Sequence, residues 1–309
     1  LNLVAVTEAP EPEPVVARIS PFEAPWTGAE PRREAMLNMA AGRYGFSVWQ
    51  GEGGARSPFR SGSGDGFTAL ANADHAIKGG VSLGALTFTA ETGGGDRTSL
   101  LRPVERDAST YSRFAMAWQG ARGALHASFG ALDERMGPLG AYLPMGSDLA
   151  LPTRTAFGGL GGDYLLTPGL WLSGEAGVGH SELKGRFLSL DRAAISSMWR
   201  AALTADCSKW ADWCSSLTWE ISQPLRIESG TFAARLADVP LEYFDPTTFS
   251  TRRFSAAPSG RQIDFSIRGV RLLPDGSALR LEAVAIRQDQ HIRDAAPGYA
   301  LLAGWARRF

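Results

Sequence analysis

The chain has 309 residues, of which 44% are hydrophobic and 20% charged, and its formal net charge at pH 7 is -1. The near-neutral charge excludes the basic footprint of a nucleic-acid-binding protein, and four histidines with two cysteines leave few ligands for a zinc cluster. No run approaches the roughly 18 apolar residues of a membrane helix. The composition does not exclude a transmembrane β-barrel, because the strands of such a barrel are about 9–11 residues long and only half apolar.

The first 40 residues differ from the rest in composition. Leu1 is not an initiator Met and no basic and apolar targeting pattern follows it, which predicts a processed or truncated piece of a longer protein. Residues 8–14 are Glu-Ala-Pro-Glu-Pro-Glu-Pro, a composition that favours extended chain over a packed core. We interpret residues 1–40 as a linker or a segment threaded through a pore. Within them, residues 31–39 are expected to form a short helix.

From residue 41 onward the sequence predicts strands. In residues 262–268 and 279–285 every second side chain is apolar, and Pro274-Asp275-Gly276 supplies the tight turn of a hairpin between them. The same reading predicts about twelve strands, near 42–50, 65–77, 81–92, 111–120, 123–133, 155–167, 170–182, 197–209, 211–223, 261–273, 277–290 and 298–309.

The predicted links sort by length. Short links follow the even strands, at 79–80, 120–123, 167–169, 207–214 and 273–276, whereas long polar links, such as 93–110, 134–154, 183–196 and 224–260, follow odd strands. Outer-membrane barrels sort their turns in this way, and a soluble sandwich has no reason to do so. We therefore predict an all-β fold over 41–309: a transmembrane antiparallel β-barrel of about twelve strands in the lipids of a bacterial outer membrane. An N-terminal extended or short helical segment is expected in or near the lumen.

Side-chain parity separates an apolar face from a polar one. The predicted outer face carries Phe114, Met116, Trp118, Leu125, Ala127, Phe129, Trp199, Ala201, Leu203, Leu217, Trp219, Ile221, Phe265 and Ile267. The predicted inner face carries a ladder of both charge signs, in which cross-strand pairs stiffen the wall. This lumen polar ladder comprises Arg113, Glu175, Arg200, Asp206, Glu220, Asp264, Arg268, Arg280 and Glu282. In a soluble sandwich the same charges would form the solvated face.

Cys207 and Cys214 flank a short predicted turn. Their spacing is not Cys-x-x-Cys and no histidine lies nearby, so in an oxidising periplasm they predict a small structural disulfide in preference to a redox or metal pair. The loop that it closes is short, which makes it a local staple. No metal site and no cofactor is predicted.

The last strand resembles the terminal strand that the barrel-assembly machinery recognises in outer-membrane proteins. Gly304, Trp305 and the terminal Phe309 stand at matching positions and form the expected assembly signal. Arg307 and Leu302 depart from the pattern, since an apolar and a polar residue are usual there.

Two runs, 223–230 and 257–264, resemble the C-terminal barrel region of large subtilisin-like (S8) serine peptidases from Gram-negative bacteria, and Leu1-Asn2-Leu3 resembles the close of a subtilisin-type domain. The resemblance covers roughly 197–309. It implies an autotransporter-like translocator that anchors its own N-terminal passenger, a subtilisin-like protease that precedes this chain in the full-length protein. None of the peptidase's Asp, His and Ser motifs is present, so no catalytic residue and no enzyme activity is predicted for the chain itself.

Two other functions stay open. One is a stand-alone outer-membrane channel or binding barrel. The other is an outer-membrane lipid hydrolase, for which His126-x-Ser128 is the one lead, since a base beside a hydroxyl is the minimum for nucleophilic catalysis. Parity places both residues in the lumen, away from lipid. The link 224–260 is long and aromatic enough to bind another protein.

Overall fold

A computed structural model of the chain describes residues 32–41, 43–52, 67–71, 73, 75–99, 102–135, 137, 139, 151–208, 214–238, 248–274 and 277–307. Within these residues regular structure is β apart from two short 3-10 helices, η2 (Thr68–Ala71) and η4 (Asp289–His291). None of the helices described is long and apolar enough to cross a membrane.

The strands are longer than the predicted ones at one end of the sheet. Their bounds are β1 (Arg32–Ala41), β2 (Tyr44–Glu52), β3 (His75–Leu83), β4 (Leu86–Ser99), β5 (Arg102–Gln119), β6 (Gly123–Glu134), β7 (Thr153–Thr167), β8 (Leu170–Leu183), β9 (Leu188–Asp206), β10 (Ser216–Ala237), β11 (Phe249–Ser255), β12 (Ile263–Leu272), β13 (Ser277–Arg287) and β14 (Gly298–Arg307).

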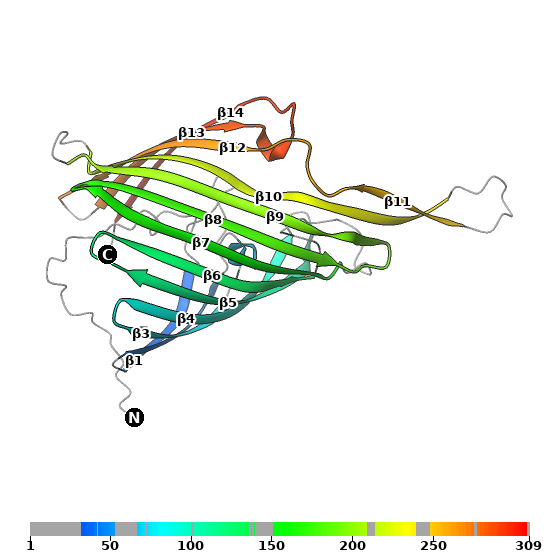
Figure 1. Cartoon of the computed structure of the whole chain (residues 1–309), viewed down its shortest axis with the longest axis horizontal. Coiled ribbons are helices and arrows are strands. Elements are labelled where there is room, and N and C mark those ends of the chain that lie inside the picture. Colours follow the sequence, from blue (N-terminus) through cyan, green and yellow to red (C-terminus); the bar gives the residue numbers. More distant parts are fainter. Residues whose placement is uncertain are drawn as a thin grey trace.

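All described pairings are antiparallel, and each strand pairs with the next along the chain, except that β12 follows β10 and β11 pairs with β10 alone. The result is one curved sheet with β1 and β14 at its two edges (Figure 1). The predicted all-β class is confirmed. The described sheet is open, because β1 and β14 have no strand partner on their outer edges among the residues described.

Three sequence predictions are wrong. Residues 32–41 form a strand that pairs with the edge of β2, and the short helix predicted at 31–39 does not form. Strand pairing satisfies the backbone hydrogen-bonding groups, whereas an isolated helix of this length is only marginally stable. The predicted strand 65–77 is instead η2 followed by β3. Gly79 and Gly80 lie inside β3, and the turn falls at Gly84, whose φ of 64° suits a two-residue hairpin.

The links sort by length only in part, and three predicted long links are not loops over their predicted extent. Residues 93–110 and 183–196 lie largely in strands, and so does 224–260, where β10 continues to Ala237 and pairs with β11. One end of the sheet, the short-link end, carries 42–43, 84–85, 120–122, 168–169, 207–215 and 273–276. The opposite end, the long-link end, carries 53–74, 135–152, 238–262 and 288–297, of which 238–262 contains β11. It also carries the short links 100–101 and 184–187.

Candidate functional site

The two faces of the sheet differ in chemistry. We call inner the face on which η2 packs, through Phe67 and Ala71 against Tyr111, Leu132, Phe157 and Met198. The outer face carries large apolar side chains that stay exposed, such as Phe129 at 65% and Leu160 at 67%, and Phe114 stacks on Phe129 with ring centroids 5.5 Å apart. Exposed apolar side chains gathered on one face are typical of surfaces that contact a membrane or another protein.

The predicted ladder residues lie on the inner face, and the structure brings six of them into two ion-pair groups. Arg200 of β9 lies opposite Glu175 of β8, with Nη2 3.0 Å from Oε2. Around β12, Arg268 contacts Glu282 at 3.1 Å and Glu220 at 3.8 Å, and Arg280 also pairs with Glu282. All six side chains are largely buried, so each charge depends on its partner for compensation.

The other three ladder residues lie apart from these groups. Arg113 is opposite Glu91 in the β4–β5 register, and the Tyr111 hydroxyl donates to Glu91 at 2.6 Å. Asp206 accepts from the Ser208 hydroxyl at 2.6 Å, and Asp264 accepts from the Gln262 amide at 2.8 Å. The ladder is therefore a set of separate polar contacts along the inner face.

η2 adds an apolar patch that sequence reasoning missed. Phe67 is fully buried and stacks on Phe157 with ring centroids 5.2 Å apart. Glycines make room for the ring, since a Cβ at Gly179 would lie 2.5 Å from Phe67 Cε1, and the Ser109 hydroxyl donates to the Ala71 carbonyl at 2.6 Å. The glycines at alternate positions of β8, Gly177 and Gly179, are the sequence signal for this close approach.

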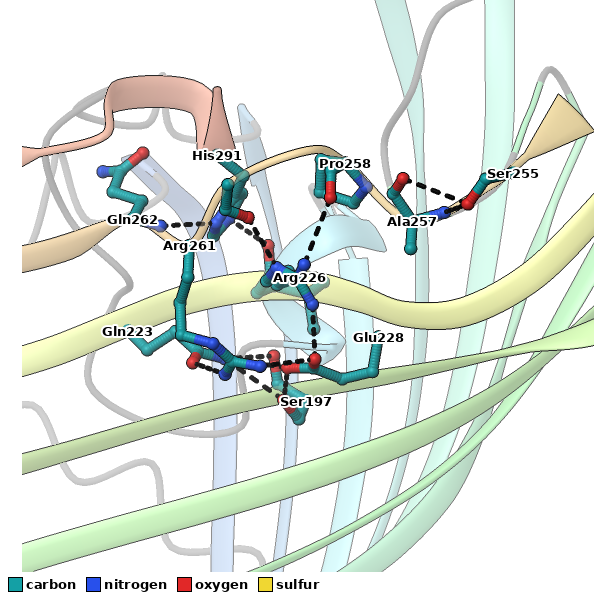
Figure 2. Close-up of polar contacts among 12 residues, drawn as sticks. Ser197, Gln223, Arg226, Glu228, Ser255, Ala257, Pro258, Arg261, Gln262 and His291 are labelled. Atoms are coloured by element: carbon teal, nitrogen blue, oxygen red, sulfur yellow. Dashed lines mark hydrogen bonds and ion pairs between the residues drawn. The ribbon is translucent and has the colours of Figure 1, made fainter. Parts of the chain in front are cut away.

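A polar network joins β9, β10 and the segment before β12 near the long-link end (Figure 2). Glu228 is its centre: it accepts from the Ser197 hydroxyl at 2.6 Å and from Arg261 Nη2 at 2.7 Å, and it pairs with Arg226. Arg226 also donates to the Gly260 carbonyl at 2.9 Å and to the Pro258 carbonyl at 3.2 Å. Gln223, fully buried, donates to Ser197 Oγ at 3.1 Å and accepts from Arg261.

His291 connects this network to the link between β13 and β14. Its Nδ1 accepts from the Gln262 backbone N–H at 2.9 Å, so the proton of the neutral ring is on Nε2, which donates to the Leu225 carbonyl at 3.1 Å. The Gly260 N–H donates to the His291 carbonyl at 2.6 Å. Burial lowers the pKa of His291 below its usual 6.5; its bond to the Leu225 carbonyl opposes this, and the nearby Arg226 charge adds to it. We call this contact set the His291 clamp.

The predicted disulfide between Cys207 and Cys214 is confirmed, with Cα atoms 5.5 Å apart at the short-link end. At the C-terminus, Gly304 lies opposite Arg280, and Trp305 is 58% exposed on the outer face of β14. Phe309 lies outside the described residues. His126 and Ser128 face inward, opposite Gly161 and Gly159, and no group of three or more metal-ligating side chains gathers among the residues described.

Comparisons of the chain with family models, with curated proteins and with solved structures give no match in any of the three. The geometry therefore carries the argument for a function: one antiparallel sheet has an apolar outer face and a polar inner face with paired charges, and its four longest links share one end.

Proposed function

We propose that the sheet closes into an outer-membrane β-barrel that anchors an N-terminal passenger and translocates it, the passenger being a subtilisin-like protease. The observation that carries the proposal is that one face of the sheet is apolar and exposed, while the other face carries buried ion pairs. In a bilayer the outer face meets lipid, and the ion pairs line the lumen. The long links then face the outside and the short links the periplasm.

Closure is proposed between β2 and β14. Thirteen strands follow one another in the sheet, so β1 and β14 run parallel, whereas β2 and β14 run antiparallel. Bacterial single-chain barrels have an even number of antiparallel strands, and the wall from β2 to β14 contains twelve. In the closed form β1 leaves the edge of β2. The edge of β14 that faces away from β13 has no strand partner among the residues described, so its backbone groups can pair with a further strand.

The inner face favours an anchor over an open channel. A twelve-stranded wall is wide enough for a thread or a short helix, but η2 and its apolar contacts occupy part of this face. The lipid-hydrolase alternative lacks support, because His126 and Ser128 lie on the face opposite to the proposed lipid surface. The resemblance of residues 223–230 and 257–264 to the barrel region of subtilisin-like peptidases supplies the class of passenger.

Surface display in a Gram-negative host tests the proposal. The chain is placed behind a signal peptide and an epitope-tagged subtilisin-like domain, and the matched control lacks 298–307, the residues of β14. We expect the complete chain in the outer-membrane fraction and the tag accessible to antibody on intact cells, with neither in the control. An inserted chain whose tag stays periplasmic would contradict the translocator role. A chain that never enters the outer membrane would contradict the barrel as well.

A further inference from the structure

The β10–β11 hairpin projects beyond the rest of the sheet at the long-link end (Figure 1). Its register runs from Thr231 opposite Ser255 to Ala237 opposite Phe249. On the other edge of β10, pairing with β9 continues as far as Ala234. The far edge of β11 has no partner strand among the strands described. A row of backbone donors and acceptors is therefore free to pair with an added strand.

Cationic and aromatic side chains flank that edge. Arg252 and Arg253 are adjacent and so project from opposite faces of the hairpin, and Phe254 is 49% exposed. Arg253 Nε lies 2.8 Å from Asp191, yet its side chain is 62% exposed. Arg252 forms no ion pair with any carboxylate of the described residues. Each face of the edge thus presents a guanidinium with donors to spare.

These charges decide what can pair with the edge. A second copy of β11, antiparallel and centred on the strand, would place Arg252 opposite Arg252, and like charges directly opposite are destabilising. Carboxylates opposite the two arginines are favourable. Because Arg252 and Arg253 project from opposite faces, a complementary strand needs two adjacent acidic residues, one for each face.

We infer that the far edge of β11 binds an extended acidic segment of a partner protein as an added strand. Two adjacent carboxylates of the segment contact Arg252 and Arg253, and an aliphatic residue beside them packs on Phe254. Main-chain hydrogen bonds supply affinity in this mode, and the side chains supply specificity. The inference stands on the hairpin alone and holds whether or not the sheet closes in a membrane.

Peptide binding to the purified full chain in detergent tests this surface. The probe is a short fluorescent peptide of alternating threonine and valine with two adjacent glutamates at its centre. One control peptide carries lysines in place of the glutamates. A second control peptide carries N-methyl groups that remove backbone N–H donors from both of its edges. By fluorescence anisotropy we expect both controls to bind about tenfold more weakly than the probe.

Charge reversal distinguishes binding of the peptide at Arg252 and Arg253 from nonspecific attraction between opposite charges. The double variant Arg252→Glu/Arg253→Glu is expected to prefer the lysine peptide, whereas Arg154→Glu, at an exposed arginine on β7, keeps the original preference. Absence of binding by the glutamate probe, or an unchanged preference after reversal, would overturn the inference. A dimer of the original chain in analytical sedimentation that is absent in the double variant would also overturn the inference. Because these assays need no membrane insertion, their outcome is independent of surface display.

Discussion

Phe67 stacks on Phe157 with ring centroids 5.2 Å apart and ring planes 4° from parallel. This contact fixes the link between β2 and β3 to the inner face of a wall built from β5, β6, β7 and β9. Gly179 permits it, since the ring occupies the space that a side chain there would need. The inner face, which elsewhere carries buried ion pairs, thereby acquires an apolar patch.

Removing the Phe67 ring should loosen η2. Phe67→Ala gives up stacking and burial worth about 3–5 kcal/mol, and we expect faster amide hydrogen exchange at residues 68–71 and a larger single-channel conductance in planar bilayers. The matched control is Phe88→Ala, on the outer face, where the ring is 38% exposed. Equal conductance and equal exchange in the two variants would show that η2 does not obstruct the lumen.

The inner ion pairs should be costly to break. Glu282→Gln leaves Arg268 and Arg280 without their shared, buried carboxylate, and we expect a loss of about 3–5 kcal/mol in the free energy of unfolding. The control is Glu182→Gln, whose partner Lys184 lies 3.6 Å away and whose side chain is 56% exposed; it should cost about 1 kcal/mol or less. Urea unfolding in detergent, followed by tryptophan fluorescence, measures both. Similar losses for the two variants would contradict the burial argument.

The disulfide should act locally. Cys207 and Cys214 are 7 positions apart, so the entropy of closing this loop corresponds to about 2–3 kcal/mol. The double variant Cys207→Ser/Cys214→Ser should lower stability by no more than this and leave the β-sheet signal in circular dichroism unchanged. Loss of the sheet on reduction would mean that the bond supports far more than its own turn.

The His291 clamp should weaken in acid. Because burial lowers the pKa of the folded-state imidazole below 6.5, the unfolded chain takes up the proton more readily. The stabilising contribution is complete above about pH 6.5 and is lost as the pH falls through the lowered pKa. Protonation also places a second N–H against the Gln262 N–H.

Hydrogen exchange of residues 288–297 between about pH 8 and pH 5 measures this release, after correction for intrinsic exchange rates. His291→Asn is the control, because its side-chain oxygen accepts from Gln262 at every pH and asparagine tolerates the positive φ of 59°. We expect the acid-dependent increase to disappear in this variant. An increase of the same size in both chains would assign the effect to other groups, of which Glu228, Arg226 and Arg261 are the nearest charges.

Alternation of side chains was enough to predict the β class, the hairpin of β12 and β13, and the face on which each ladder residue lies. Contacts between distant segments were not predictable in the same way. Residues 32–41 pair with β2 because an edge was available, and Phe67 docks where Gly179 leaves room. The partners within the ladder depend on register, which places Arg268 opposite Glu282 and Glu175 opposite Arg200.

The local sequence was also insufficient to predict strands and contacts inside the predicted links. The segment 224–260 was predicted as a long polar link, yet Phe232 and Phe254 lie across the β10–β11 pair with ring centroids 5.4 Å apart. The His291 clamp has no sequence motif, since its backbone partners, Gln262 N–H and the Leu225 carbonyl, are available at any residue type.

Disulfide trapping in outer-membrane fractions tests closure of the barrel most directly. Single cysteines at Tyr44, Phe46 and Val48 of β2 are each combined with one at Leu301, Ala303 or Trp305 of β14, and links are read by peptide mass. We expect links between β2 and β14 in an antiparallel pattern, with residues near Tyr44 joined to those near Trp305. Links from β14 to a cysteine at Met39 of β1, which lies beside Phe46 in the open sheet, with none to β2, would contradict it.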